Sequence, residues 1–147
     1  RKTFGQLGRA HAETQRRRGV RIVSENEISA GVLDSAMVVH RTLGPGLLES
    51  VYSKALALEL RSRGLDVEVE VPVDIFYKGE ALGLGFRADL IIANRVLVEL
   101  KSVEVMLPVH RKQVLTYLKA KDVKLGHLIN FGAPLLKDGF ERIANGL

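Results

Sequence analysis

The sequence contains no cysteine and no tryptophan, and aromatic residues make up only 5% of it. The lack of cysteine excludes disulfides and thiolate metal sites, so any metal must be held by oxygen atoms or by the four histidines. It also fits a reducing compartment, and we expect a cytoplasmic protein. The scarcity of aromatic side chains argues against a stacking surface for single-stranded nucleic acid.

Long apolar runs are also missing from the sequence. We therefore expect neither a membrane-spanning helix nor a secretory signal peptide. A chain of 147 residues is close to the usual size of one domain. At this length it can bury roughly 70% of its unfolded surface in a single core.

Acidic residues are scarce only near the N-terminus. Residues 1–22 carry seven basic side chains and one acidic side chain, whereas residues 23–147 carry fifteen basic and sixteen acidic ones. The positive charge therefore lies in a basic arm, residues 1–22, ahead of a nearly neutral domain, residues 23–147. Such an arm can bind phosphate backbones without reading sequence; a solvated tail is the alternative.

Two helices are predicted ahead of a region of strands. Ser24 and Glu27 have the spacing of a capping box and open a helix whose apolar residues recur at helical spacing. The Gly44-Pro45-Gly46 segment ends this helix, and a second helix is expected over residues 47–63.

The rest of the chain alternates between strand and helix patterns. Strands are predicted over residues 67–71, 74–77, 85–92 and 96–103, a helix over 108–121, another strand over 125–131, and a last short strand or turn over 140–143. This order predicts an α/β fold with a mixed central sheet flanked by helices.

The hairpin within residues 85–103 brings charged residues together. If residues 93–95 form its loop, counting back places Asp89 opposite Glu99 and Arg87 opposite Lys101. A shift of one residue in the register would separate the two acids, so the placement depends on the loop length.

Alternation along the two strands separates their faces. Phe86, Ala88 and Leu90 are predicted on the face opposite to Asp89 and Glu99. Two carboxylates directly opposite each other repel, and a divalent cation would compensate, with Mg²⁺, Mn²⁺ or Ca²⁺ favoured by oxygen ligands. The alternative is a solvated face on which nearby basic side chains neutralise the acids.

Asp89, followed by Glu99-Leu100-Lys101, resembles the D…E-x-K signature of the PD-(D/E)XK nuclease superfamily. The signature occurs by chance in many hairpins, and the second predicted helix makes the match specific. There, Gly46, Glu49 and Tyr52 fit the pattern G-x-x-E-x-x-Y of the GxxExxY family within that superfamily.

The similarity covers about residues 24–145 and leaves the basic arm outside. Further segments typical of the GxxExxY family are residues 39–45, 85–90, 108–110 and 128–131. The resemblance implies a restriction-endonuclease-like core.

The resemblance also implies a metal site. Asp89 and Glu99 would bind Mg²⁺, with Mn²⁺ as a substitute, and the backbone carbonyl of Leu100 is a further candidate ligand. Glu49 would be a third acid near the metal. It also lies in the first turn of its helix, where the helix dipole favours a carboxylate regardless of catalysis.

Three more residues would complete the site. Lys101 would position or activate the attacking water, with a salt bridge to either acid as the alternative. Gln113 and Tyr117, four residues apart on one helix face, would line the site; a purely structural hydrogen bond is the competing interpretation. Tyr52 fits the core as well as it fits a site.

The sequence therefore predicts a metal-dependent nuclease that hydrolyses phosphodiester bonds of nucleic acid, with DNA the expected substrate. The alternative is a catalytically silent nucleic-acid-binding or protein-interaction module that keeps the fold. A homo-oligomer or a separate targeting partner is open in either case, and no membrane partner is expected.

Overall fold

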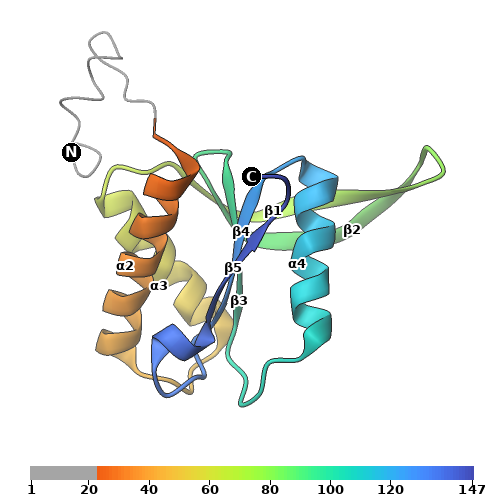
Figure 1. Ribbon diagram of the computed structural model, residues 1–147. Helices are drawn as coiled ribbons and strands as arrows, with labels where there is room; N and C mark the ends of the chain where they lie inside the picture. The colour runs from red at the N-terminus through yellow and green to blue at the C-terminus, as the bar shows by residue number, and fades with distance from the viewer. Residues whose placement is uncertain (1–22) are drawn as a thin grey trace, which may run out of the picture.

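The computed structural model describes residues 23–147, so the predicted basic arm lies outside the described part of the chain. At its centre is a five-stranded sheet in the order β1-β2-β3-β4-β5, with helices on both faces (Figure 1). This confirms the predicted α/β architecture. None of the described helices is long and apolar enough to cross a membrane. The elements are α2 (Glu25–Leu43), α3 (Glu49–Ser62), β1 (Val67–Tyr77), β2 (Glu80–Ile92), β3 (Val96–Lys101), α4 (Pro108–Lys121), β4 (Leu125–Asn130), the 3₁₀ turn η1 (Leu136–Gly139) and β5 (Phe140–Ala144).

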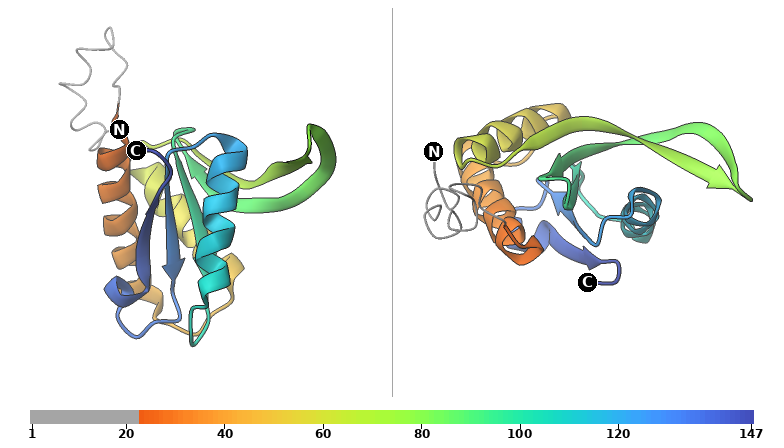
Figure 2. Two further views of the ribbon diagram at one scale, coloured as in Figure 1. Left: turned by 45° about the vertical axis from the view of Figure 1, so that its right-hand side comes forward. Right: turned by 90° about the horizontal axis from the view of Figure 1, so that it is seen from above.

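The sheet is mixed because one pair of its strands is parallel. β3 and β4 run parallel and are connected through α4, whereas the other three neighbouring pairs are antiparallel. A parallel pair needs such a crossover connection, which here places α4 on one face of the sheet. Helices α2 and α3 cover the other face (Figure 2).

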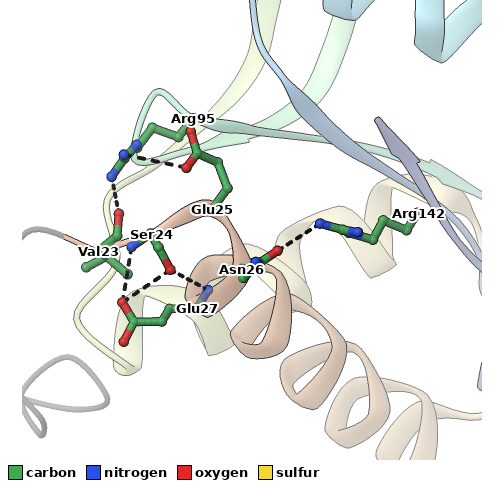
Figure 3. A network of polar contacts seen from close by, with 7 residues as sticks. All are labelled: Val23, Ser24, Glu25, Asn26, Glu27, Arg95 and Arg142. Atoms are coloured by element: carbon green, nitrogen blue, oxygen red, sulfur yellow. Dashed lines mark hydrogen bonds and ion pairs between the residues drawn. The ribbon is translucent and has the colours of Figure 1, made fainter. Parts of the chain in front are cut away.

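Helix α2 begins at the predicted capping box. The Ser24 hydroxyl accepts a hydrogen bond from the Glu27 backbone N–H at 3.1 Å, and the Glu27 carboxylate accepts one from the Ser24 N–H at 3.1 Å (Figure 3). In the same network Arg95, from the turn between β2 and β3, forms an ion pair with Glu25 at 3.6 Å. The start of the helix is thus anchored to the hairpin that carries the predicted acids.

The strands predicted over residues 67–71 and 74–77 are in fact one continuous strand, β1. Its partner β2 begins at Glu80, earlier than predicted, and the two strands form a ribbon that extends beyond the sheet (Figures 1 and 2). Pro72 does not interrupt β1 because this strand is at the edge of the sheet, where a proline costs no ladder hydrogen bond. The irregularity falls instead at Asp74, where the register shifts on both sides.

Two hydrophobic clusters lie on the two faces of the sheet. On the α2 and α3 side, the buried residues include Ile28, Leu56, Leu60, Leu90, Val98, Leu100 and Phe131. On the α4 side they include Val73, Ala88, Leu97, Val114, Leu118 and Leu128. Alternate residues of β3 therefore enter opposite clusters, as a strand buried on both faces requires.

The predicted position of Phe86 and Ala88 is wrong. Leu90 packs on the α2 and α3 side, whereas Ala88 and Phe86 pack with the α4 cluster. The strand alternation is interrupted near Asp89, where the residue opposite it, Glu70, has a left-handed backbone with φ of 49°. Beyond this point β2 has no hydrogen-bonded pairing with β3, so the ribbon is free to twist.

The ends of β3 and β4 are fastened to each other. The Asn130 side chain donates to the Val103 carbonyl at 2.9 Å and accepts from the Val103 N–H at 3.0 Å. A Cβ atom on Gly132 would lie 2.3 Å from that same carbonyl oxygen, so only glycine fits there. These contacts fix the backbone directly after Lys101.

A buried histidine predicts a specific acid sensitivity. His127 of β4 is fully buried, with Nε2 2.8 Å from the Ser29 hydroxyl, and burial lowers its pKa to about 4. Between about pH 6.5 and pH 4, His127 is therefore protonated in the unfolded chain but not in the folded one. Lowering the pH through this range should reduce the free energy of unfolding by about 3 kcal/mol. We expect His127→Gln to remove this loss in urea unfolding compared at pH 7 and pH 4. Equal losses in both proteins would exclude His127 as its source.

Candidate active site

Asp89 and Glu99 come together where β2 separates from β3. The hairpin register is as predicted, with Ile92 opposite Val96, and its regular pairing ends at Leu90 opposite Val98. One residue further along β2, the side-chain carboxylate of Asp89 takes the place of a backbone carbonyl as hydrogen-bond acceptor for β3. Its Oδ2 accepts a hydrogen bond from the Leu100 N–H at 2.7 Å, and the Asp89 N–H donates to Oε1 of Glu99 at 3.4 Å. The two acids thus occupy the opening between the strands.

Both carboxyl groups resist ionisation. Burial raises the pKa of Asp89, and the hydrogen bond from Leu100 only partly offsets this. Burial, followed by the charge of Asp89, raises the pKa of Glu99 to about 8. Glu99 is 8% exposed, which is unusual for a carboxylate without a buried partner. The alternative of a solvated face, considered from the sequence, therefore does not describe the surroundings of these acids.

Basic side chains do not neutralise the pair directly. Within residues 23–147, neither Lys101 nor Arg87 forms an ion pair with Asp89 or Glu99. Lys101 is half-buried at the end of β3, and its charge lowers the pKa of both acids without a direct contact. The prediction that Arg87 lies opposite Lys101 is wrong. Arg87 pairs with Pro72 of β1 and is exposed.

Helix α4 faces the acids with Tyr117. The pKa of the Tyr117 phenol is raised to about 12. Burial is the largest cause, and the charges of Glu99 and Asp89 also contribute, so the phenol interacts electrostatically with both acids. The ring also contacts Phe86 of β2. Gln113 is half-buried one turn earlier on the same face of α4, and no hydrogen bond joins it to either acid in the described part of the chain.

Two residues of the G-x-x-E-x-x-Y segment have different roles: Tyr52 is structural, whereas Glu49 acts on the site through its charge. Tyr52 is fully buried, stacks on Phe131 at 4.5 Å between ring centroids, and hydrogen-bonds to the Gly44 carbonyl and the Leu47 N–H. It is a core residue that holds the turn before α3. Glu49, the first residue of α3, is exposed, and its charge raises the pKa of both buried acids.

Sequence reasoning missed Glu70. This exposed residue of β1 lies opposite Asp89 between the paired residues on either side, and its charge contributes to the raised pKa of Asp89. The alternation of valine and glutamate in residues 67–71 indicates a strand but not its register. Only the pairing of β1 with β2 reveals that Glu70 belongs to this surface.

The acids suit a cation that keeps most of its own water. Among residues 23–147, no three histidine, aspartate or glutamate side chains converge closely enough to form a ligand set by themselves. Buried Glu99 and half-buried Asp89 nevertheless both have raised pKa values, and a bound cation would offset their repulsion and the cost of burying their charge. Mg²⁺ is commonly held by one or two carboxylates, with water and substrate phosphate completing its shell.

The family can now be assigned. A family model described as the PD-(D/E)XK nuclease superfamily matches residues 26–143, and the chain belongs to this superfamily. Nucleases of this superfamily generally use divalent metal ions. The comparison with curated proteins gives no match.

One solved structure is similar to this chain. It is described as the crystal structure of SSO0001, and it has 20% sequence identity and a TM-score of 0.47. The similarity covers 95% of this chain and 62% of that one, so the chain spans less than two thirds of its length. The family assignment therefore rests on the family model.

The buried acids predict a site that destabilises the metal-free fold. The folded state holds the Glu99 proton more tightly than the unfolded state, because the pKa of Glu99 is about 4.5 in the unfolded chain and about 8 in the folded one. The free energy of unfolding therefore falls as the pH rises from about 4.5 to 8. Glu99→Gln should therefore raise the melting temperature at pH 8.5 without divalent cations by roughly 5 °C or more. Glu104→Gln, at an exposed position after β3, is the matched control and should have little effect. A lower melting temperature for Glu99→Gln would contradict this account.

Proposed function

We propose that the protein is a metal-dependent nuclease that hydrolyses phosphodiester bonds of nucleic acid, with DNA as the substrate. The observation that carries the proposal is the pair formed by half-buried Asp89 and buried Glu99, which no basic side chain of the described residues neutralises by an ion pair. Buried charges without a partner are costly, and a site that receives a cation gives a reason for the cost. Gly46, Glu49 and Tyr52 support placement in the GxxExxY family of the superfamily.

Asp89 and Glu99 would hold Mg²⁺, or Mn²⁺ in its place. The Leu100 backbone carbonyl is a candidate for a further oxygen ligand, because it belongs to the segment that Asp89 already fastens through the Leu100 N–H. Glu49 is a candidate to hold water on the cation rather than the cation itself, because no three acidic or histidine side chains of the described residues converge on one point, although its charge raises the pKa of both acids. When bound, the cation would supply positive charge for the phosphate and would favour deprotonation of water.

Lys101 would stabilise charge at the reacting phosphate. It follows Glu99 by two residues along β3, so the two side chains emerge on the same face of the strand. Since Lys101 forms no ion pair with either acid in the described chain, its ammonium group is available to the substrate or to the attacking water.

Tyr117 and Gln113 would orient these groups from α4. The phenol of Tyr117 keeps its proton, because burial and the two acids raise its pKa to about 12. It can therefore donate a hydrogen bond at the site but not act as a base near neutral pH. Gln113, one turn earlier, offers both a donor and an acceptor at the edge of the core.

Replacing Lys101 separates catalysis from folding and metal binding. Lys101→Met keeps the apolar stem and removes the charge, so we expect normal thermal unfolding and unchanged Mn²⁺ binding by calorimetry. Initial cleavage rates in Mg²⁺ or Mn²⁺ should fall by about 10²-fold or more. The substrates are linear duplex, single-stranded and branched DNA, together with structured RNA.

Lys54→Met, at an exposed position on α3, is the matched control and should leave cleavage unchanged. Asp89→Ala should abolish both cleavage and Mn²⁺ binding. Equal cleavage by the parent and Lys101→Met would remove Lys101 from the mechanism. A parent that cleaves nothing in the panel with either metal would favour a silent binding module with a nuclease-like fold.

A further inference from the structure

Positive charge in the described domain is concentrated on one helix. Residues 108–124, which comprise α4 and the turn after it, contain five basic residues and one acidic residue. The other described residues contain ten basic and fifteen acidic ones. A polyanion approaching the domain is therefore attracted to α4 and repelled by most of the remaining surface.

Four of these basic side chains are free to bind a ligand. Lys112, Lys119, Lys121 and Lys124 are exposed, and none forms an ion pair within residues 23–147. The fifth, Arg111, is paired with Glu141 of β5 at 2.6 Å.

The lysines lie on the helix that reaches the acids. Tyr117 and Gln113 point from α4 toward the sheet, and Thr116, Lys112 and Lys119 continue around the helix onto its exposed side. Among the helices of residues 23–147, α4 alone covers its face of the sheet, and none of the others lies over its outer side (Figure 2). A ligand on Lys112 and Lys119 would thus lie along the outer side of the helix whose inner side carries Tyr117.

The site itself cannot attract a phosphate backbone. Within residues 23–147, the charges that shift the pKa values of Asp89 and Glu99, besides those of the two acids themselves, come from Glu49, Glu70 and Lys101, so acidic groups outnumber basic ones around the site. Even with a divalent cation bound, the local charge does not favour a polyanion. Binding energy has to come from cations outside the site that hold the phosphates next to it.

We propose that the exposed side of α4, with Lys112 and Lys119, binds the phosphate backbone of a nucleic-acid duplex, with Lys121 and Lys124 adding positive charge at the end of the helix. The proposal rests on the proposed nuclease function and assigns the surface that holds its substrate. Lys112 and Lys119, seven residues apart, lie on the same side of the helix and are about 10 Å apart along it, given a rise of about 1.5 Å per residue, which is about three base pairs of duplex. The exposed positions of α4 include no aromatic residue, so binding is through phosphates and independent of sequence.

The test compares two pairs of lysines that differ only in location. In full-length protein carrying Asp89→Asn to prevent cleavage, Lys112→Ala with Lys119→Ala removes two charges from α4. Lys54→Ala with Lys137→Ala removes two exposed charges from elsewhere. Binding to a 20-base-pair DNA duplex and its RNA counterpart is measured by fluorescence anisotropy over a range of salt concentrations.

The α4 pair should weaken duplex binding by about 10-fold or more and lower the salt slope by about 1.8, that is, about 0.9 per lost phosphate contact. The control pair should change neither. Equal losses of duplex affinity for both pairs of lysines would show that only net charge matters, and would overturn the proposal. The proposal would also be overturned if the Asp89→Asn protein bound neither duplex. If the α4 pair alone lowers binding but the unmodified protein cuts nothing, the nuclease proposal fails and the binding surface remains.

Discussion

The repulsion and burial of Asp89 and Glu99 impose the constraint on which the rest of the site depends. The regular pairing of β2 with β3 stops just before this pair, and the Asp89 carboxylate takes the place of a ladder partner for the Leu100 N–H. The fold tolerates this because β3 is secured on its other side by six parallel pairs with β4. The backbone after Lys101 is fastened as well, through Asn130. The firmly paired strand β3 thus holds Glu99 close to Asp89 of β2, although the two carboxylates repel each other.

Local patterns predicted the parts of the structure that local forces decide. The capping box at Ser24 and Glu27 and the register of the β2–β3 hairpin are as predicted, because both depend on residues close in sequence. The placement of Phe86 and the role of Glu70 depend on how β1 pairs with β2 and on the left-handed backbone at Glu70, which no periodicity reveals.

The candidate site follows the same division between local and long-range determinants. Asp89, Glu99 and Lys101 lie within one hairpin, so the alternation of its strands is enough to gather them. The proximity of Tyr117 to the acids depends on how α4 packs across the sheet, and the G-x-x-E-x-x-Y pattern does not distinguish a core tyrosine from a catalytic one. Packing decides this case, since Tyr52 is stacked on Phe131 and hydrogen-bonded at its hydroxyl.

The central claim is that the opening between β2 and β3 is a metal site, and anomalous diffraction from crystals soaked in Mn²⁺ tests it most directly. The account predicts an anomalous peak between Asp89 and Glu99, with at least one oxygen of each carboxylate within about 2.0–2.6 Å of the ion. Soaked crystals without a peak between the two acids, or with manganese bound only elsewhere, would contradict it.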